Sequence, residues 1–219
     1  MRDFVELLIS YDQANVIGTQ DAAEVLGEHV VDSLSCMQVP AFSDARTVVD
    51  VGSGAGLPGI PLAIVNQNKN FTLVDSVGKK TTFQRLAISR LGLGNIVSVK
   101  KRIEEAGRDD LHRERYDLVT CRALASLDVL MEYCLPLVRV GGSVISMKGR
   151  LEKSELQRGE TAAKRLGGTI REIHSVERLE SQTSKERQLV VVEKVRRTPV
   201  RYPRDVGVPA KKPLGDEPS

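Results

Sequence analysis

Short apolar runs alternate with stretches of helical periodicity through the middle of the chain. Each run has the length of a strand, is rich in Val, Leu or Phe, and is bounded by glycine or polar residues. We predict strands at 46–51, 70–75, 95–99, 116–121 and 141–147, and helices at 58–66, 78–91 and 127–138. Because such alternation requires right-handed crossovers, it predicts a parallel sheet with helices on both faces.

Further elements are predicted on either side of this alternating segment. Apolar residues recur at helical spacing within 4–11, and Asp21, followed by Glu24, has the pattern of an N-cap with a capping box. The predictions beyond residue 150 are a polar helix at 152–166 and two strands, at 169–176 and 188–195. We expect this strand pair to be antiparallel, which gives a mostly parallel sheet of seven strands.

The pattern divides the chain into three segments. These are an N-terminal helical cap over 1–45, a Rossmann-like domain over 46–195 and a basic C-terminal tail over 196–219. From Thr198 the tail is rich in proline and has no periodicity, so we expect this segment to be extended or mobile. The connection 177–187 is charged, and we expect an exposed loop there.

The composition argues against several classes of protein, among them disulfide-linked, zinc-binding and membrane proteins. The net charge of +3 over 219 residues is only mildly basic. Three widely separated cysteines, none in a Cys-x-x-Cys spacing, argue against disulfides and against a zinc site, and we expect them to be buried in the core. No apolar run approaches the length of a membrane span and no secretory leader is evident. We therefore expect a cytoplasmic protein with no metal and no membrane partner.

A glycine-rich turn after the first predicted strand is the candidate cofactor site. It reads Asp50-Val51-Gly52-Ser53-Gly54-Ala55-Gly56-Leu57-Pro58-Gly59. Glycine permits positive φ and close approach of a ligand to the backbone, and a helix is expected to start at Pro58. The letters satisfy the dinucleotide fingerprint G-x-G-x-x-G, but they also suit S-adenosylmethionine, so the turn alone leaves both cofactors open.

Two acidic residues favour the second cofactor. Asp50 ends the first strand, and a carboxylate aimed into the loop would repel a pyrophosphate but attract the ammonium and sulfonium groups of S-adenosylmethionine. Asp75 ends the next strand and could accept hydrogen bonds from both ribose hydroxyls. The other interpretation of Asp75 is a helix cap. His29 and Asp32 lie three residues apart on a predicted helix and are assigned no chemistry.

The carboxyl ends of the remaining strands give further candidates, because ligands of such sheets bind there. These are Ser76, Val77, Ile103, Glu104, Arg122, Lys148 and Gly149. The chain has no phosphate-binding loop, no Gly-x-Ser-x-Gly elbow and no Asn-Pro-Pro-Tyr cluster at Thr120-Cys121-Arg122-Ala123. A guanine N7 acceptor fits these absences, since its lone pair needs alignment with a methyl group and no general base.

Seven motifs resemble the bacterial small-subunit ribosomal-RNA guanine-N7 methyltransferases, also known as the glucose-inhibited division protein B family. They are 28–34 (EHVVDSL), 50–62 (DVGSGAGLPGIPL), 73–80 (LVDSVGKK), 120–125 (TCRALA), 147–149 (MKG), 202–204 (YPR) and 211–214 (KKPL). The resemblance implies a class I S-adenosylmethionine-dependent fold and methylation of a guanine in the decoding-region hairpin of 16S rRNA. It implies 16S rRNA or the 30S subunit as partner, and we expect a monomer.

The turn and the resemblance together give the candidate residues. Those expected to contact the cofactor are Asp50, Gly52, Gly54, Gly56, Leu57, Asp75, Ser76, Val77, Ile103, Glu104 and Arg122. Those expected to contact RNA are Lys79, Lys80, Arg122, Lys148, Arg187, Arg197, Arg201 and Arg204. The catalytic residue stays unknown. Two other hypotheses remain open: an RNA-binding assembly factor that keeps the fold without turnover, and a nicotinamide-dependent oxidoreductase.

Overall fold

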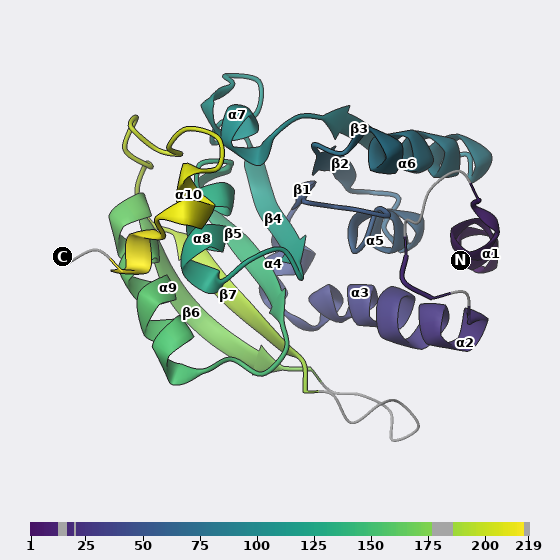
Figure 1. Cartoon of the computed structure of the whole chain (residues 1–219), viewed down its shortest axis with the longest axis horizontal. Coiled ribbons are helices and arrows are strands. Elements are labelled where there is room, and N and C mark those ends of the chain that lie inside the picture. The colour runs from purple at the N-terminus through teal and green to yellow at the C-terminus, as the bar shows by residue number, and fades with distance from the viewer. Residues whose placement is uncertain (13–16, 20, 177–185, 217–219) are drawn as a thin grey trace.

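A seven-stranded sheet forms the centre of the computed structural model, which describes residues 1–12, 17–19, 21–176 and 186–216 (Figure 1). The strands are β1 (Thr47–Val51), β2 (Asn70–Asp75), β3 (Ile96–Lys100), β4 (Tyr116–Arg122), β5 (Val138–Lys148), β6 (Gly168–Ser175) and β7 (Gln188–Lys194). Their order is β3-β2-β1-β4-β5-β7-β6. The first five pair in parallel, β7 is antiparallel to β5, and β6 is antiparallel to β7. The predicted sheet is confirmed.

Alternate residues of the central strands enter two separate cores. Val48 and Leu118 belong to one core, whereas their neighbours Val49 and Val119 belong to the other. All four are fully buried, as a strand covered on both faces requires. This explains why consecutive residues in the middle of β1 and β4 are apolar instead of alternating with polar ones.

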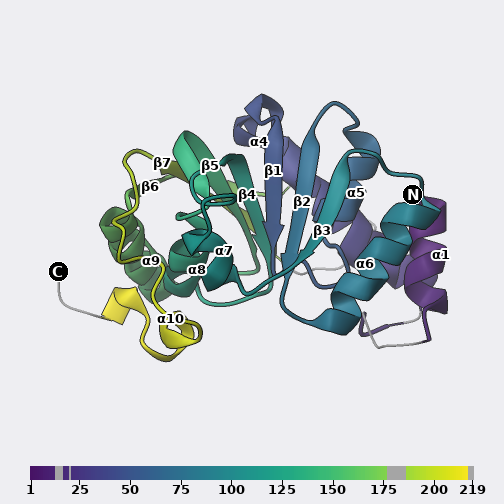
Figure 2. The ribbon, with the colours of Figure 1, turned by 90° about the horizontal axis from the view of Figure 1, so that it is seen from above.

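Helices cover both faces of the sheet (Figure 2). The first core takes in residues of the N-terminal helices, α5 and α6, and the second takes in residues of α7, α8 and α9. The bounds are α5 (Gly59–Val65), α6 (Gly78–Arg90), α7 (Ile103–Arg108), α8 (Leu127–Cys134) and α9 (Lys153–Leu166). All were predicted except α7, which is only six residues long and contains Gly107.

The N-terminal segment is a chain of short helices. They are α1 (Arg2–Ser10), α2 (Ala22–Glu24), a π-helix η1 (Val25–Val31), α3 (Asp32–Leu34), a 3₁₀ turn η2 (Ser35–Gln38) and α4 (Pro40–Asp44). Asp21 is an N-cap, as predicted, because its Oδ1 accepts from the Ala23 N–H at 2.8 Å. The capping box is wrong: the Glu24 carboxylate instead accepts from the Thr19 hydroxyl at 2.7 Å.

The C-terminal segment is folded, so the prediction that it is extended or mobile is wrong over 198–216. It contains α10 (Val208–Lys211) and a 3₁₀ turn η3 (Leu214–Asp216), and Tyr202 and Leu214 are buried in the second core. The guanidinium of Arg204 donates to both carboxylate oxygens of Glu132 on α8, whose side chain is 1% exposed. The predicted loop at 177–187 lies mostly outside the described residues.

Cys36, Cys121 and Cys134 are free and buried, as expected. In the part of the chain that the structure describes, no helix combines the length and apolar character needed to cross a bilayer. The same residues contain no cluster of three or more His, Cys, Asp or Glu side chains arranged for a metal ion.

Candidate active site

The glycine-rich turn folds over the carboxyl ends of β1 and β2. Gly52, Gly54 and Gly56 have φ values of +63°, +56° and +84°, a region that residues with a Cβ rarely adopt. The N–H groups of Gly52 and Ser53 donate to the carbonyl of Val74 at 2.9 and 3.3 Å. The turn is thereby tied to the strand that carries Asp75.

Asp75 is held in a fixed orientation by two backbone hydrogen bonds. Its Oδ2 accepts from the Gly54 N–H and its Oδ1 from the Val77 N–H, both at 2.8 Å. The residue is 7% exposed. Each carboxylate oxygen can accept a further hydrogen bond, so the group can still bind a ligand.

Asp75 lines a cavity of about 510 Å³, here called the glycine-loop cavity. Its lining is Gly52, Asp75, Ser76, Val77, Lys80, Arg102, Ile103, Glu104, Ala123, Leu124, Tyr133, Val206, Gly207 and Ala210. The volume lies within the range of roughly 300–1,000 Å³ typical of small-ligand sites. Six of the predicted cofactor residues therefore share one cavity: Gly52, Asp75, Ser76, Val77, Ile103 and Glu104.

The C-terminal segment forms a wall of this cavity that the sequence did not reveal. Val206, Gly207 and Ala210 belong to the lining, and the Gly207 N–H donates to the Glu104 carboxylate at 2.8 Å. Glu104 thus joins α7 to the C-terminal segment. The signal in the sequence was the presence of apolar residues in the basic tail, among them Tyr202, Val206 and Leu214.

Asp50 is not part of the cavity lining. It is 1% exposed, its Oδ2 accepts from the Gly59 N–H at 2.9 Å, and its Oδ1 accepts from the Thr120 hydroxyl at 3.4 Å. Burial raises the pKa of Asp50 to about 7, against the opposing effects of the Gly59 hydrogen bond and the charge of Arg122. The structure therefore gives Asp50 a role at the start of α5 and keeps its carboxylate out of the lining of the cavity to which Asp75 belongs.

The other glycine-turn candidates lie in the turn itself. Leu57 is buried in the first core, and a Cβ on Gly56 would lie 2.3 Å from Ile60 Cδ1, so helix packing accounts for this glycine. A Cβ on Gly54 would meet the Lys80 Nζ at 3.6 Å and no other side chain within 4 Å. Gly54 is thus the turn glycine with an open face, which the Lys80 side chain overhangs.

A second cavity of about 350 Å³, here called the arginine cavity, adjoins the first. Its lining is Glu24, Glu28, His29, Asp32, Arg122, Ala123, Met147, Lys148, Gly149 and Arg187. Ala123 lines both cavities and has a φ of +49°, a strained conformation for a residue with a Cβ. The two cavities therefore meet just beyond the carboxyl end of β4.

Ion pairs organise the arginine cavity. Asp32, which is 4% exposed, lies 3.3 Å from Arg122 Nη1 and 3.3 Å from Arg187 Nε. Arg187 also lies 3.2 Å from the Glu28 carboxylate. Burial lowers the pKa of His29, with a further contribution from the charge of Arg122, so its ring is neutral at pH 7. Arg122, predicted to contact the cofactor or the incoming base, lies in this cavity.

The predicted RNA-contacting residues do not gather on one surface. Arg122, Lys148 and Arg187 line the arginine cavity, Lys80 lines the glycine-loop cavity, and Lys79 is exposed. Lys148 is paired with Glu155 at 2.7 Å.

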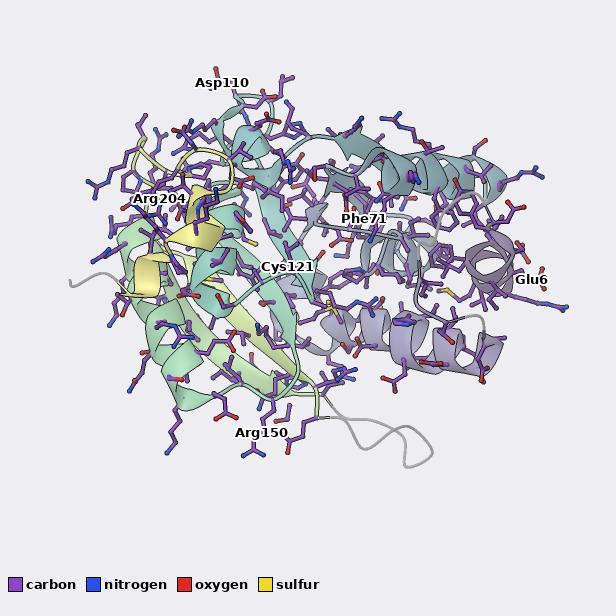
Figure 3. All side chains as sticks on the ribbon, viewed as in Figure 1. Glu6, Phe71, Asp110, Cys121, Arg150 and Arg204 are labelled. Carbon is purple, nitrogen blue, oxygen red and sulfur yellow. The ribbon has the colours of Figure 1, made fainter. Side chains whose placement is uncertain are left out.

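The three arginines of the C-terminal segment have different surroundings. Arg197 is exposed, Arg201 lies over the Tyr202 ring at 5.1 Å, and Arg204 binds Glu132. Figure 3 shows Arg204 beside the C-terminal helix, far from Glu6 on α1.

The sheet order, the turn after β1 and the acid at the end of β2 define the class I S-adenosylmethionine-dependent methyltransferase fold. Solved structures agree on the fold. A 16S rRNA (adenine(1408)-N(1))-methyltransferase from Catenulisporales acidiphilia has a TM-score of 0.57 at 14% identity, over 75% of this chain and 93% of the other. M. jannaschii TYW2 in complex with AdoMet has a TM-score of 0.55 at 14% identity, over 75% and 77%.

Sequence comparison identifies the family within this class. The family model described as "rRNA small subunit methyltransferase G" (GidB) matches residues 1–190. A Ribosomal RNA small subunit methyltransferase G from Rubrobacter xylanophilus is 48% identical over 215 residues, 98% of this chain and 82% of the relative. The chain belongs to the rRNA small subunit methyltransferase G family, and the resemblance noted in the sequence is confirmed.

Proposed function

We propose that this protein transfers the methyl group of S-adenosylmethionine to N7 of a guanine in 16S rRNA. The observation that carries the proposal is the pair of cavities that meet at Ala123, beyond the ends of the parallel strands. One cavity is suited to the methyl donor and the other to a base. The names of the family and of its members support RNA of the small subunit as the substrate.

The residues of the glycine-loop cavity fit S-adenosylmethionine. The carboxylate of Asp75 is preoriented by Gly54 and Val77 and can accept hydrogen bonds from ribose hydroxyls. Ile103, Leu124 and Tyr133 offer apolar contacts for an adenine ring. The lining holds two acids, Asp75 and Glu104, and two bases, Lys80 and Arg102, so it can bind a cofactor that carries both an ammonium and a carboxylate group.

The chemistry requires alignment and no general base. When bound, S-adenosylmethionine supplies a methyl carbon on a cationic sulfur; the N7 lone pair can bond to this carbon as the C–S bond breaks, and the positive charge passes to the guanine. The chain must then hold the donor, direct N7 toward the border at Ala123 and exclude water. The neutral His29 and the arginine–carboxylate network of the second cavity can orient a base without removing a proton from it.

The natural substrate on this proposal is 16S rRNA, either free or within the 30S subunit, which would place the reaction in the cytoplasm. We expect one copy of the chain to suffice, because the described lining of both cavities comes from a single chain.

Two measurements test the proposal in sequence. Isothermal titration with S-adenosylmethionine is expected to show binding to the folded protein, and NAD is expected to show none. Radiolabelled methyl transfer to 30S subunits or 16S rRNA from a strain lacking the protein should then yield 7-methylguanine, located by chemical cleavage at the modified base. RNA binding without methylation, by protein that binds S-adenosylmethionine, would refute the enzyme proposal and favour an assembly factor.

A further inference from the structure

The π-helix η1 brings a carboxylate to the arginine cavity from the N-terminal cap. Glu28 lies within this helix, and Asp32 follows at its end. A π-helix costs stability relative to an α-helix and occurs frequently at functional sites. Its position here, together with the strained backbone of Ala123, marks the arginine cavity as a site shaped for a ligand.

We propose that the arginine cavity receives the acceptor guanine and that Glu28 reads its N1–H and N2 amino edge. This inference rests on the proposed function. With N7 directed at the border with the glycine-loop cavity, the N1 and N2 donors point away from the reacting atom, because they lie on a different edge of the purine. Two parallel N–H donors match the two oxygens of one carboxylate. Adenine presents an N1 lone pair at the same place, which a carboxylate repels.

Three carboxylates line the cavity, and their surroundings separate their roles. Glu24 is exposed and accepts from the Thr19 hydroxyl at 2.7 Å, so it belongs to the rim. Asp32 lies between Arg122 and Arg187 and positions both guanidinium groups. The side chain of Glu28 is 11% exposed and pairs with Arg187, which keeps Asp32 as a second partner. Glu28 can therefore give up its ion pair with Arg187 and bind a base, while Arg187 stays paired with Asp32.

The charge balance favours the same assignment. In the structure Glu28 and Asp32 oppose Arg122 and Arg187, two negative charges against two positive ones. Methyl transfer makes the guanine ring positive. A carboxylate already hydrogen-bonded to that ring stabilises the charge as it develops, so Glu28 contributes to rate as well as to recognition.

The test replaces Glu28→Gln and measures methyl transfer to 30S subunits that carry either the target guanine or adenine in its place. The carboxamide keeps the size of the side chain but offers one donor and one acceptor, so it loses one of the two acceptors that match N1–H and N2–H of guanine, while its NH₂ group can donate to N1 of adenine. A bidentate base contact is worth about 1–3 kcal/mol, so the rate on guanine should fall by roughly 5- to 150-fold. The ratio of guanine to adenine methylation should fall at least about tenfold, with the affinity for S-adenosylmethionine unchanged.

The matched control is Glu6→Gln, which neutralises another helix glutamate paired with an arginine, Arg2, at 2.9 Å on the exposed surface of α1. Its rate and base preference should equal those of the unmodified protein. If Glu28→Gln impairs folding, Glu28→Asp replaces it, and a reduced rate with the guanine preference retained is expected.

The outcomes separate the inference from the proposed function. Unmodified protein that binds S-adenosylmethionine but methylates no subunit refutes the proposed function. Unmodified protein that is active, together with a folded Glu28→Gln variant of unchanged rate and base preference, overturns the inference alone. Loss of base preference in Glu28→Asp would also overturn it, because that variant keeps the carboxylate.

Discussion

Asp75 and Asp50 end neighbouring strands, yet only Asp75 lines the glycine-loop cavity, and this difference gives a direct test of the donor site. Replacing each by asparagine keeps the shape of the side chain and removes its charge. Asp75→Asn should weaken S-adenosylmethionine binding strongly, whereas Asp50→Asn should leave it nearly unchanged. The two variants are matched controls for each other.

The magnitude follows from the hydrogen bonds of the carboxylate. A hydrogen bond to a charged group contributes about 1.5–3 kcal/mol, and loss of one ribose contact therefore weakens binding by roughly 10- to 150-fold. In ligand-free Asp75→Asn, the side-chain NH₂ group would also face the backbone N–H of Gly54 or of Val77. In the unmodified protein each of these N–H groups donates to an Asp75 carboxylate oxygen at 2.8 Å. This unsatisfied donor costs about 1–3 kcal/mol of unfolding free energy.

Isothermal titration gives the two affinities, and thermal unfolding gives the stability of each variant without ligand. We expect Asp50→Asn to change the affinity by less than about threefold, which is less than roughly 0.7 kcal/mol. Equal affinities in the two variants, or a larger loss in Asp50→Asn, would refute the assignment of Asp75 as the ligand-binding acid.

Three further predictions follow from the same structure. The pKa of Asp50 in the folded state is about 7, against 3.8 for an ordinary aspartate, so the folded protein keeps a proton on this carboxyl that the unfolded chain loses. The contribution of Asp50 to the unfolding free energy therefore falls as the pH rises from about 4 to 7. Urea titrations across this range should show a smaller fall in the unfolding free energy of Asp50→Asn than of the unmodified protein, and parallel curves would contradict the burial of this charge. Lys79→Glu should weaken RNA binding, make it less dependent on salt, and leave the affinity for S-adenosylmethionine unchanged. Lys80→Glu should weaken the binding of both RNA and S-adenosylmethionine, because the Lys80 side chain overhangs Gly54 and lines the glycine-loop cavity. Equal affinities for S-adenosylmethionine in the two variants would contradict this placement. Glu132→Ala removes the buried partner of Arg204 and should lower the unfolding free energy by about 3–5 kcal/mol, which thermal unfolding can measure. It should also weaken the binding of S-adenosylmethionine, measured by titration, because the C-terminal segment forms a wall of the glycine-loop cavity. An unchanged thermal midpoint would refute the role of this ion pair in holding the C-terminal segment.

The sheet was predictable because its signals are local. Val48 and Val49 lie in a short apolar run that ends in a glycine turn, and each later strand also contains a short run of mostly apolar residues. Crossover helices between these runs then make the strands parallel. Candidate cofactor-binding residues at the strand ends, such as Asp75 and Val77, could therefore be predicted from the sequence.

Other features depend on contacts that sequence spacing does not encode. Whether Asp50 faces a ligand or the Gly59 N–H depends on the orientation of its side chain at the end of β1. The wall formed by Val206 and Gly207 comes from residues more than 80 positions beyond α7, and it is held there by Glu104. The folded C-terminal segment was missed for the same reason, since its anchor is the pairing of Arg204 with Glu132 of α8.

Ala123 has a consequence for how the two substrates influence each other. Since this residue belongs to both walls, a shift of its left-handed backbone on binding of one substrate changes the space offered to the other. Any such coupling is reciprocal: the factor by which RNA changes the affinity for the methyl donor equals the factor by which the donor changes the affinity for RNA. One alanine would thus link the loading of the donor to the choice of the nucleotide.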